Sequence, residues 1–259
     1  MAAQRLSLTR VPYPMTVPAE TVTLPARGFR IDPRKALIAA LLCWGGFSLV
    51  AWAVLSGHTS AIDKAGLLFW HDASLRPSGS RRTLEIVRDV TALGGVVLRN
   101  LFALGAVTAL LFLRLKREAA LLALTVAGGW IVNSALKALV GRARPEIIHH
   151  LTEAGGNSFP SGHSFNSAVV YIAMALAFAA MSRRQPVRIT IVAAALLVSM
   201  ATAWSRVWLG VHWPSDVVAG WLGGAGWAFL ASALLYRPAK EAADRISSPD
   251  PARVSAPTG

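Results

Sequence analysis

The chain has 259 residues, of which 54% are hydrophobic and only 15% are charged, and its mean hydropathy is +0.49. This composition excludes an ordinary soluble protein. The 26 Lys and Arg residues outnumber the 13 Asp and Glu residues, which gives a net charge of +13. In a soluble chain this charge would suggest a nucleic-acid partner, but here the basic residues form short clusters between long apolar runs. That pattern is typical of a membrane protein with basic cytoplasmic loops, so we expect no nucleic-acid partner.

Six apolar runs approach the length of about 20 residues that a helix needs to cross the hydrocarbon core. The sequence therefore predicts an all-α polytopic membrane protein, a bundle of six transmembrane helices with both termini on one side. We expect this membrane domain to cover residues 36–236, with disordered tails at 1–35 and 237–259. The predicted spans are residues 36–56, 90–113, 119–136, 164–182, 189–205 and 217–236.

The orientation follows from the short loops, in which the bias of Lys and Arg is most reliable. The loops at 114–118 and 182–188 are short and basic, which places them and both tails in the cytoplasm of, we expect, a bacterial inner membrane. The first outer loop is basic too, but it is longer. Within it, residues 60–74 suit either a short helix at the membrane surface or an irregular loop with scattered apolar residues.

Three clusters of polar residues fall at the outer ends of the predicted spans. Hydropathy alone placed the spans, so the sequence predicts that these clusters converge on one membrane face. The clusters are Lys137, Arg142 and Arg144 after the third span, Ser161, Gly162 and His163 before the fourth, and Arg206, His212 and Asp216 between the fifth and sixth.

The first chemical feature of these clusters is a set of cations that suits a phosphate. Lys137, Arg144 and Arg206 have few acidic neighbours in the sequence, and each guanidinium can bind a phosphate through two nitrogens. The turn at Ser161 and Gly162 opens a helix, so backbone N–H groups and the positive end of the helix dipole add to the site. We expect these residues to form a phosphate-binding site.

Two histidines stand beside this expected phosphate site. Asp216 follows His212 by four residues, so its carboxylate can hold one imidazole nitrogen and make the other a better nucleophile. His163 can give a proton to the departing oxygen. These residues predict a reaction in two steps, attack of His212 on phosphorus and then hydrolysis of the phosphohistidine, with the cations stabilising the transition state.

The spacing of these residues resembles the three-part signature of the type 2 phosphatidic acid phosphatase superfamily. Six residues separate Lys137 from Arg144 and Pro145, and five separate Arg206 from His212. No signature position departs from the pattern, and the membrane branch of the family has six helices. The resemblance implies a metal-independent enzyme without a cofactor. It also implies that His212 is the nucleophile, Asp216 its orienting partner and His163 the general acid, with Lys137, Arg144, Ser161, Gly162 and Arg206 binding phosphate.

The resemblance further implies a lipid phosphate or diphosphate as substrate, reached from the membrane at its outer face. Phosphatidic acid, phosphatidylglycerophosphate and undecaprenyl diphosphate are the leading candidates. A lipid A phosphatase or a phosphotransferase on the same fold stays open, and a transporter of an anion or a lipid is a more distant alternative. The motifs do not distinguish these substrates, because the phosphate is held in the same way in each.

Several polar and aromatic residues lie outside the signature. We expect Arg142 to anchor the helix end at the membrane surface and Arg99 to extend its charge to that surface, although Arg99 could also pair or touch a headgroup. We expect His149 and His150 to be surface residues. The tryptophans near the outer ends of the last two spans fit an interfacial belt, with a role in guiding a lipid chain as an alternative.

Overall fold

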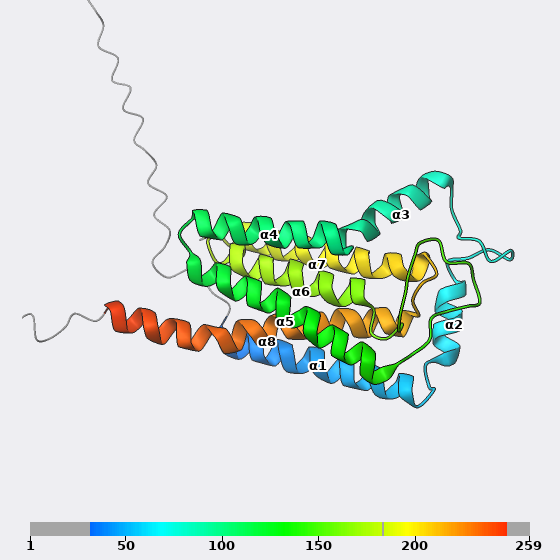
Figure 1. Ribbon diagram of the computed structural model, residues 1–259, viewed down its shortest axis with the longest axis horizontal. Helices are drawn as coiled ribbons and strands as arrows, with labels where there is room; N and C mark the ends of the chain where they lie inside the picture. Colours follow the sequence, from blue (N-terminus) through cyan, green and yellow to red (C-terminus); the bar gives the residue numbers. More distant parts are fainter. Residues whose placement is uncertain (1–31, 183, 248–259) are drawn as a thin grey trace, which may run out of the picture.

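The computed structural model describes residues 32–182 and 184–247, which form eight helices in one bundle (Figure 1). The predicted all-α membrane fold is confirmed. The parts of the two predicted tails at residues 1–31 and 248–259 lie outside the described residues. The helices are α1 (Pro33–Leu55), α2 (Ser60–Leu68), α3 (Arg81–Leu93), α4 (Val96–Phe112), α5 (Lys116–Val140), α6 (Gly162–Ala179), α7 (Gln185–Trp208) and α8 (Pro214–Ser247).

Five of these helices, α1, α5, α6, α7 and α8, are long and apolar enough to cross a membrane. The sixth predicted span differs from the expectation, because residues 90–113 do not form one helix. Helices α3 and α4 meet at an angle of 48° and are long and apolar enough to cross a membrane only when they are taken together. The last helix continues past the predicted end of its span at residue 236 to Ser247.

The bend between α3 and α4 lies at two glycines and is held by hydrogen bonds from α4 itself and from α6. Gly94 ends α3, and Gly95 precedes the first residue of α4. The Arg99 guanidinium donates to the Gly94 carbonyl at 3.1 Å, and the Tyr171 hydroxyl of α6 donates to the Leu93 carbonyl at 2.7 Å. Arg99 is only 5% exposed, so the expectation that its charge reaches the membrane surface is wrong. Its guanidinium instead satisfies a carbonyl that the break in the helix leaves without its helical partner.

Helix α6 lies at the centre of the bundle, against α5, α7 and α8, while α1 packs on α8 (Figure 1). Small residues allow this close packing. A Cβ atom at Gly224 would lie 2.1 Å from the carbonyl oxygen of Phe165, so only glycine permits the observed approach of α8 to α6. Closer to the start of both helices, a Cβ atom at Gly220 would lie 2.7 Å from the carbonyl oxygen of Ser161. The first turns of α6 and α8, which carry residues of the polar clusters, therefore lie close together.

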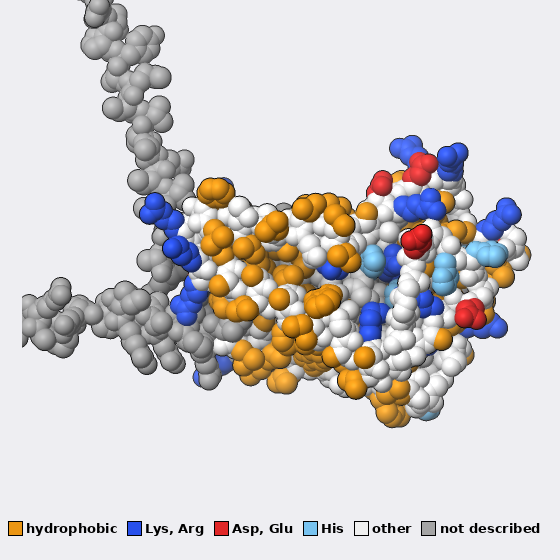
Figure 2. All heavy atoms as spheres, viewed as in Figure 1, with side chains coloured by type: hydrophobic (Ala, Val, Ile, Leu, Met, Phe, Trp, Pro, Cys, Tyr) orange, Lys and Arg blue, Asp and Glu red, His pale blue; other side chains and the backbone are white. Residues whose placement is uncertain are grey.

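The two ends of the bundle differ in chemistry. The start of α1, the turn between α4 and α5 and the far part of α8 lie at one end, and α2, α3 and the longer loops lie at the other (Figure 1). On the face seen in Figure 2, hydrophobic side chains cover the flank, and Lys and Arg mark both ends. Acidic side chains and histidines gather on this face only at the end that carries α2. The start of α1 and the far part of α8 therefore share the basic end of the bundle, and the other end has mixed charge.

Helix α2 confirms the short helix predicted within residues 60–74, and two of its residues are buried against the rest of the bundle. Asp63 and Leu67, one turn apart, are 1% and 0% exposed. Asp63 accepts a hydrogen bond of 2.9 Å from the backbone N–H of Ser215 in the first turn of α8. The inner face of α2 is thus docked on the start of α8.

Candidate active site

The loop between α5 and α6 and the loop between α7 and α8 meet at the end of the bundle that carries α2. The backbone N–H of Ser161 donates to the carbonyl of Asp216 at 3.0 Å, and that of Leu151 donates to the carbonyl of Leu209 at 3.1 Å. The predicted convergence of the three polar clusters is therefore confirmed.

His212 lies in the loop before α8, is 2% exposed, and presents its two nitrogens to different groups. Nδ1 is 3.2 Å from the Ser158 hydroxyl oxygen and 3.5 Å from Oδ2 of Asp216. The Ser158 hydroxyl in turn donates to the same Oδ2 atom. The predicted pairing of His212 with Asp216 thus runs partly through Ser158, which the sequence did not single out.

The other nitrogen of His212, Nε2, lies 3.1 Å from Nη1 of Arg144. A guanidinium can only donate, so Nε2 must carry the lone pair and Nδ1 the proton. Burial lowers the pKa of His212 to about 4, with Asp216 opposing that shift and Arg144 and Arg206 adding to it. The ring is therefore neutral near pH 7, with a lone pair on the nitrogen that faces the cations.

Arg144 is held in place by backbone carbonyls. Its Nε and Nη2 atoms donate to Gly156 and Gly155 at 3.0 and 2.8 Å, and Nη1 donates to Val211 at 2.7 Å. Burial lowers the pKa of Arg144 from its ordinary value, while the charge of Asp216 opposes this. The carbonyls orient the guanidinium without neutralising it, so its charge remains available to an anion.

Lys137 and the start of α6 form the next part of the site. The Lys137 Nζ atom donates to the carbonyl of Asn157 at 2.6 Å, and the Asn157 amide returns a bond of 2.9 Å to the Lys137 carbonyl. Ser161 is the N-cap of α6. A Cβ atom at Gly162 would lie 3.5 Å from Cε of Lys137, so this lysine stands beside the N-terminus of α6, where the helix dipole favours an anion.

Arg206 and His163 lie on the side of the site that faces the bend. Arg206 is 3% exposed, and its Nη1 atom donates to the Thr91 hydroxyl of α3 at 2.9 Å. His163, in the first turn of α6, is half-buried, and its charge would interact with those of Arg206, His212 and Arg144. A Cβ atom at Gly94 would lie 3.3 Å from Cδ2 of His163. All eight residues predicted for the site thus lie at one end of the bundle.

Arg142 is a further member of this cluster, and the expectation that it is a surface anchor is wrong. Its Nη1 atom donates to Oδ1 of Asp216 and its Nη2 atom to Oδ2 of Asp63, both at 2.7 Å. The Arg142 guanidinium binds the two buried carboxylates within its reach instead of extending to the membrane surface. Asp63 carried one usable signal in the sequence, because helical spacing places it on the same face as Leu67.

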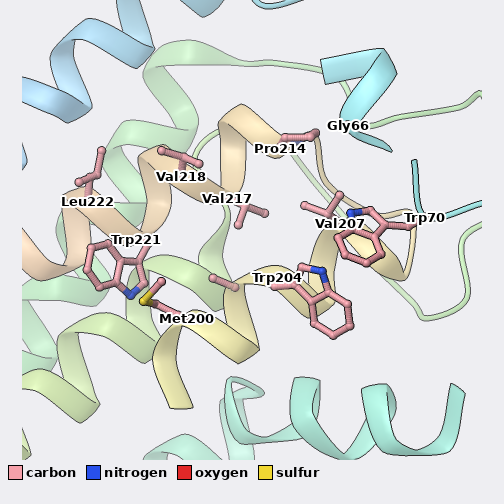
Figure 3. Close-up of a pocket in the computed structure, with 11 residues that line it drawn as sticks. Gly66, Trp70, Met200, Trp204, Val207, Pro214, Val217, Val218, Trp221 and Leu222 are labelled. Carbon is pink, nitrogen blue, oxygen red and sulfur yellow. The ribbon is translucent and has the colours of Figure 1, made fainter. Parts of the chain in front are cut away.

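The residues outside these contacts divide into surface positions and an apolar pocket. His149 and His150 are exposed, as expected. No group of three His, Cys, Asp or Glu side chains that could hold a metal ion occurs in the described part of the chain. Between α7 and α8, towards the end of the bundle that carries α2, lies a cavity of about 510 Å³, lined by Trp204, Trp221 and other apolar residues (Figure 3). Two of the tryptophans expected in an interfacial belt thus face this cavity.

Comparisons with known proteins identify the family of this chain. A family model described as the PAP2 superfamily matches residues 118–239. A lipid A 1-phosphatase from Rhizobium etli is 36% identical over 121 residues, which are 43% of this chain and 47% of that protein. Phosphatidylglycerophosphatase B from Bacillus subtilis is 31% identical over 144 residues, which are 52% of this chain and 67% of that protein.

A solved structure has the same fold. The crystal structure of a transmembrane PAP2-type phosphatidylglycerolphosphate phosphatase from Bacillus subtilis aligns with a TM-score of 0.64 and 24% identity, covering 78% of this chain and 96% of that one. The chain spans about half the length of the Rhizobium relative that it matches. From the family model, the relatives and the shared fold, this chain is an integral membrane protein that belongs to the PAP2 superfamily.

Proposed function

We propose that this protein is a membrane lipid phosphatase that hydrolyses a lipid phosphate or diphosphate through a phosphohistidine on His212. The observation that carries the proposal is the position of the Nε2 atom of His212. Its lone pair faces the guanidinium of Arg144, while Ser158 and Asp216 lie at Nδ1. A neutral imidazole whose Nε2 lone pair is directed at the cations suits attack on the phosphorus atom of a phosphoryl group that binds to those cations in the lone pair's path.

In the first step, Nε2 of His212 forms a bond to phosphorus as the bond from phosphorus to the lipid oxygen breaks. His163 protonates that oxygen, and the lipid alcohol or the shortened lipid phosphate departs. In the second step, His163 takes a proton from water, and the water oxygen displaces His212 from phosphorus. Inorganic phosphate is released, and both histidines return to their starting states.

The cations supply electrostatic stabilisation for both steps. Lys137, Arg144 and Arg206 surround the place at which the phosphoryl group would lie, and the N-terminus of α6 adds backbone N–H groups at Ser161 and Gly162. Negative charge on the phosphoryl oxygens is spread over these donors in the transition state, a task that metal ions perform in many phosphoryl-transfer enzymes. The mechanism needs neither a metal ion nor a cofactor.

The surroundings of the site favour a lipid as substrate. The proposed catalytic and phosphate-binding residues lie at one end of a transmembrane bundle, within residues 36–236. A lipid headgroup can therefore enter the site while its chain stays in the bilayer. The apolar cavity of about 510 Å³ has room for part of an acyl or prenyl chain. By the basic loops at the opposite end, both termini face the cytoplasm and the site faces the outside of a bacterial inner membrane.

The names of the relatives indicate which substrates should be tested. One is named a lipid A 1-phosphatase and another a phosphatidylglycerophosphatase, so lipid A joins phosphatidic acid, phosphatidylglycerophosphate and undecaprenyl diphosphate as a candidate. A phosphotransferase would use the same phosphohistidine with a different acceptor. An anion transporter is less favoured, because the cations lie at one end of the bundle rather than at its middle.

The proposal is tested by the release of inorganic phosphate from these four lipids by the full-length protein in detergent, with EDTA present. We expect turnover of at least one lipid, and none by the His212→Ala variant. Loss of the activity in EDTA would contradict the metal-independent mechanism. Equal inactivity of wild type and variant on all four lipids, together with uptake of an anion in vesicles, would favour the transporter.

A further inference from the structure

Two charged residues outside the family signature, Arg142 and Asp63, lie directly behind the proposed nucleophile. Arg142 belongs to the loop after α5, and Asp63 belongs to α2 in the first outer loop. Arg142 donates from Nη1 to Asp216 and from Nη2 to Asp63, at 2.7 Å each. Three charged side chains from separate parts of the sequence thus form one continuous ion-paired row that ends at His212.

The two oxygens of Asp216 have separate partners. Oδ1 accepts from Arg142, whereas Oδ2 accepts from Ser158 and from the backbone N–H of Trp213 and faces Nδ1 of His212. A guanidinium usually binds a carboxylate through both oxygens at once. Here it does not, because Nη2 is bonded to Asp63, while Nη1 donates to the Ser215 hydroxyl at 2.7 Å as well as to Oδ1. Oδ2 therefore remains available to the nucleophile.

Asp63 is itself held firmly. Its Oδ1 atom accepts from the Ser215 backbone N–H at 2.9 Å, and its Oδ2 atom accepts from the Ser215 hydroxyl at 2.7 Å. It is 1% exposed, so the carboxylate lies at the first turn of α8 with its oxygens satisfied. The short helix of the first outer loop thus delivers a fixed negative charge to the helix that carries Asp216.

We propose that Arg142 and Asp63 are positioning residues of this active site. Asp63 occupies one nitrogen of the Arg142 guanidinium, so that the other nitrogen binds a single oxygen of Asp216 and leaves the second oxygen to Ser158 and His212. This inference rests on the proposed function, and it makes α2 a part of the catalytic apparatus. Neither residue touches the phosphate, and both act through Asp216.

The charges around His212 define what each substitution does. His212 is faced by Asp216 of α8, Arg144 of the loop after α5, Arg206 of α7 and His163 of α6, with Lys137 of α5 next to Arg144 and Arg206. Without Arg142, Oδ1 of Asp216 loses the donor that fixes the carboxylate, so Oδ2 is no longer held in place at Nδ1 of His212. The charge of Asp216 then also acts on the imidazole without a competing cation, which raises the pKa of His212. Without Asp63, the guanidinium can take both oxygens of Asp216 and draw the carboxylate away from His212.

The test compares kcat and KM for phosphate release from the lipid that is turned over best. We expect Arg142→Gln to lower kcat by about 10²-fold and Asp63→Asn by about 10-fold, with KM changed less than about threefold. The double variant should be no slower than Arg142→Gln alone, because both residues act through one contact. Arg142→Lys keeps the charge but has a single nitrogen, so it should remain about 10-fold impaired. Wild-type kcat in either Arg142 variant would overturn the inference.

Arg88→Gln is the matched control. Arg88 also lies at this end of the bundle and donates at 3.0 Å, but only to the backbone carbonyl of Leu151, and it is exposed. It should keep kcat within about twofold of wild type. A loss in Arg88→Gln equal to that in Arg142→Gln would mean that any outer arginine is needed for folding, and it would overturn the positioning role.

A second readout requires no turnover. Diethyl pyrocarbonate modifies neutral imidazole, so the pH dependence of His212 modification, measured by mass spectrometry on the full-length protein, reports the protonation of His212. We expect the midpoint to rise by about one pH unit in Arg142→Gln and not to rise in Asp63→Asn or Arg88→Gln. An unchanged midpoint in Arg142→Gln would overturn the inference. If the wild type hydrolysed none of the lipids, the proposed function would fail, while these profiles would still decide the role of Arg142.

Discussion

The two histidines of the site are held in contrasting ways. His212 is almost fully buried, and both of its nitrogens face polar partners, Ser158 with Asp216 on one side and Arg144 on the other. His163 is half-buried and packs on the glycine bend between α3 and α4. Among the interactions of the described residues, no hydrogen bond of its ring is found. The His212 ring is held by hydrogen bonds, and the His163 ring is held by packing.

This difference matches what each role would require. A nucleophile must keep one tautomer and aim one lone pair at phosphorus, which fixed partners on both nitrogens achieve. A general acid must take up and release a proton in every cycle, and strong hydrogen bonds to protein groups would oppose that exchange. The polar network therefore surrounds the proposed nucleophile, and the close packing surrounds the proposed acid.

Removal of the nucleophile is the largest effect that we predict. His212→Ala should lower kcat by at least about 10³-fold, since the variant lacks the imidazole that would form the covalent intermediate. Phosphate release measured by a sensitive assay, with thermal unfolding in detergent as a check on the fold, tests this. His149→Ala, which truncates an exposed histidine near the site, should remain active. Substantial activity in His212→Ala would assign the attack to another group.

Removal of the acid should depend on the leaving group. His163→Ala should lower kcat by about 10²-fold on a lipid phosphate, whose alkoxide needs a proton to depart. It should cost much less on p-nitrophenyl phosphate, since nitrophenolate departs without protonation. Comparing both substrates in wild type and variant tests the role. An equal loss on the two substrates would indicate that His163 only shapes the site.

The contrast also shows which features the sequence could predict. The spans could be predicted because a helix that crosses the hydrocarbon core needs a long apolar run. The site residues could be predicted because they stand at fixed spacings at the ends of the spans; they are Lys137, Arg144, His163, Arg206, His212 and Asp216. That their clusters converge followed from the number of passes alone. Their roles come from chemistry and from the family resemblance.

What the sequence did not yield depends on contacts between distant segments. Arg142 looked like a surface anchor because its partners are 79 and 74 residues away, in α2 and α8. The prediction that Arg99 extends to the membrane surface was wrong because its partner carbonyl becomes free only when the second span breaks at Gly94. Hydropathy does not register such a break, since Gly94 and Gly95 are apolar enough to continue the run. Only the adjacent pair of glycines hinted at it.

The packing that holds His163 can be tested at the bend. In Gly94→Ala the new methyl group would lie 2.2 Å from Cγ2 of Thr202 and 3.3 Å from His163, so α7 or the ring must move. We expect kcat to fall by about 10-fold, because a displacement of about 1 Å is enough for such a loss. Gly105→Ala is the control, since a Cβ atom there meets no atom within 4 Å, and it should stay fully active. Equal activity of the two variants would show that the bend does not position the acid.

The smallest effect concerns the burial of neutral His212, and it appears only in acid. The pKa of this imidazole falls from its ordinary value of 6.5 to about 4, mainly through burial. Between these pH values the unfolded chain takes up a proton that the folded protein does not. Folding stability should therefore be complete above pH 6.5 and should decline by about 3 kcal/mol as the pH falls to 4. A glutamine at this position does not titrate, so the melting temperature of wild type minus that of His212→Gln should be constant above pH 6.5 and fall below it. A difference that does not change with pH would mean that the ring accepts a proton where it lies, and that the polar partners of His212 hold it in either charge state.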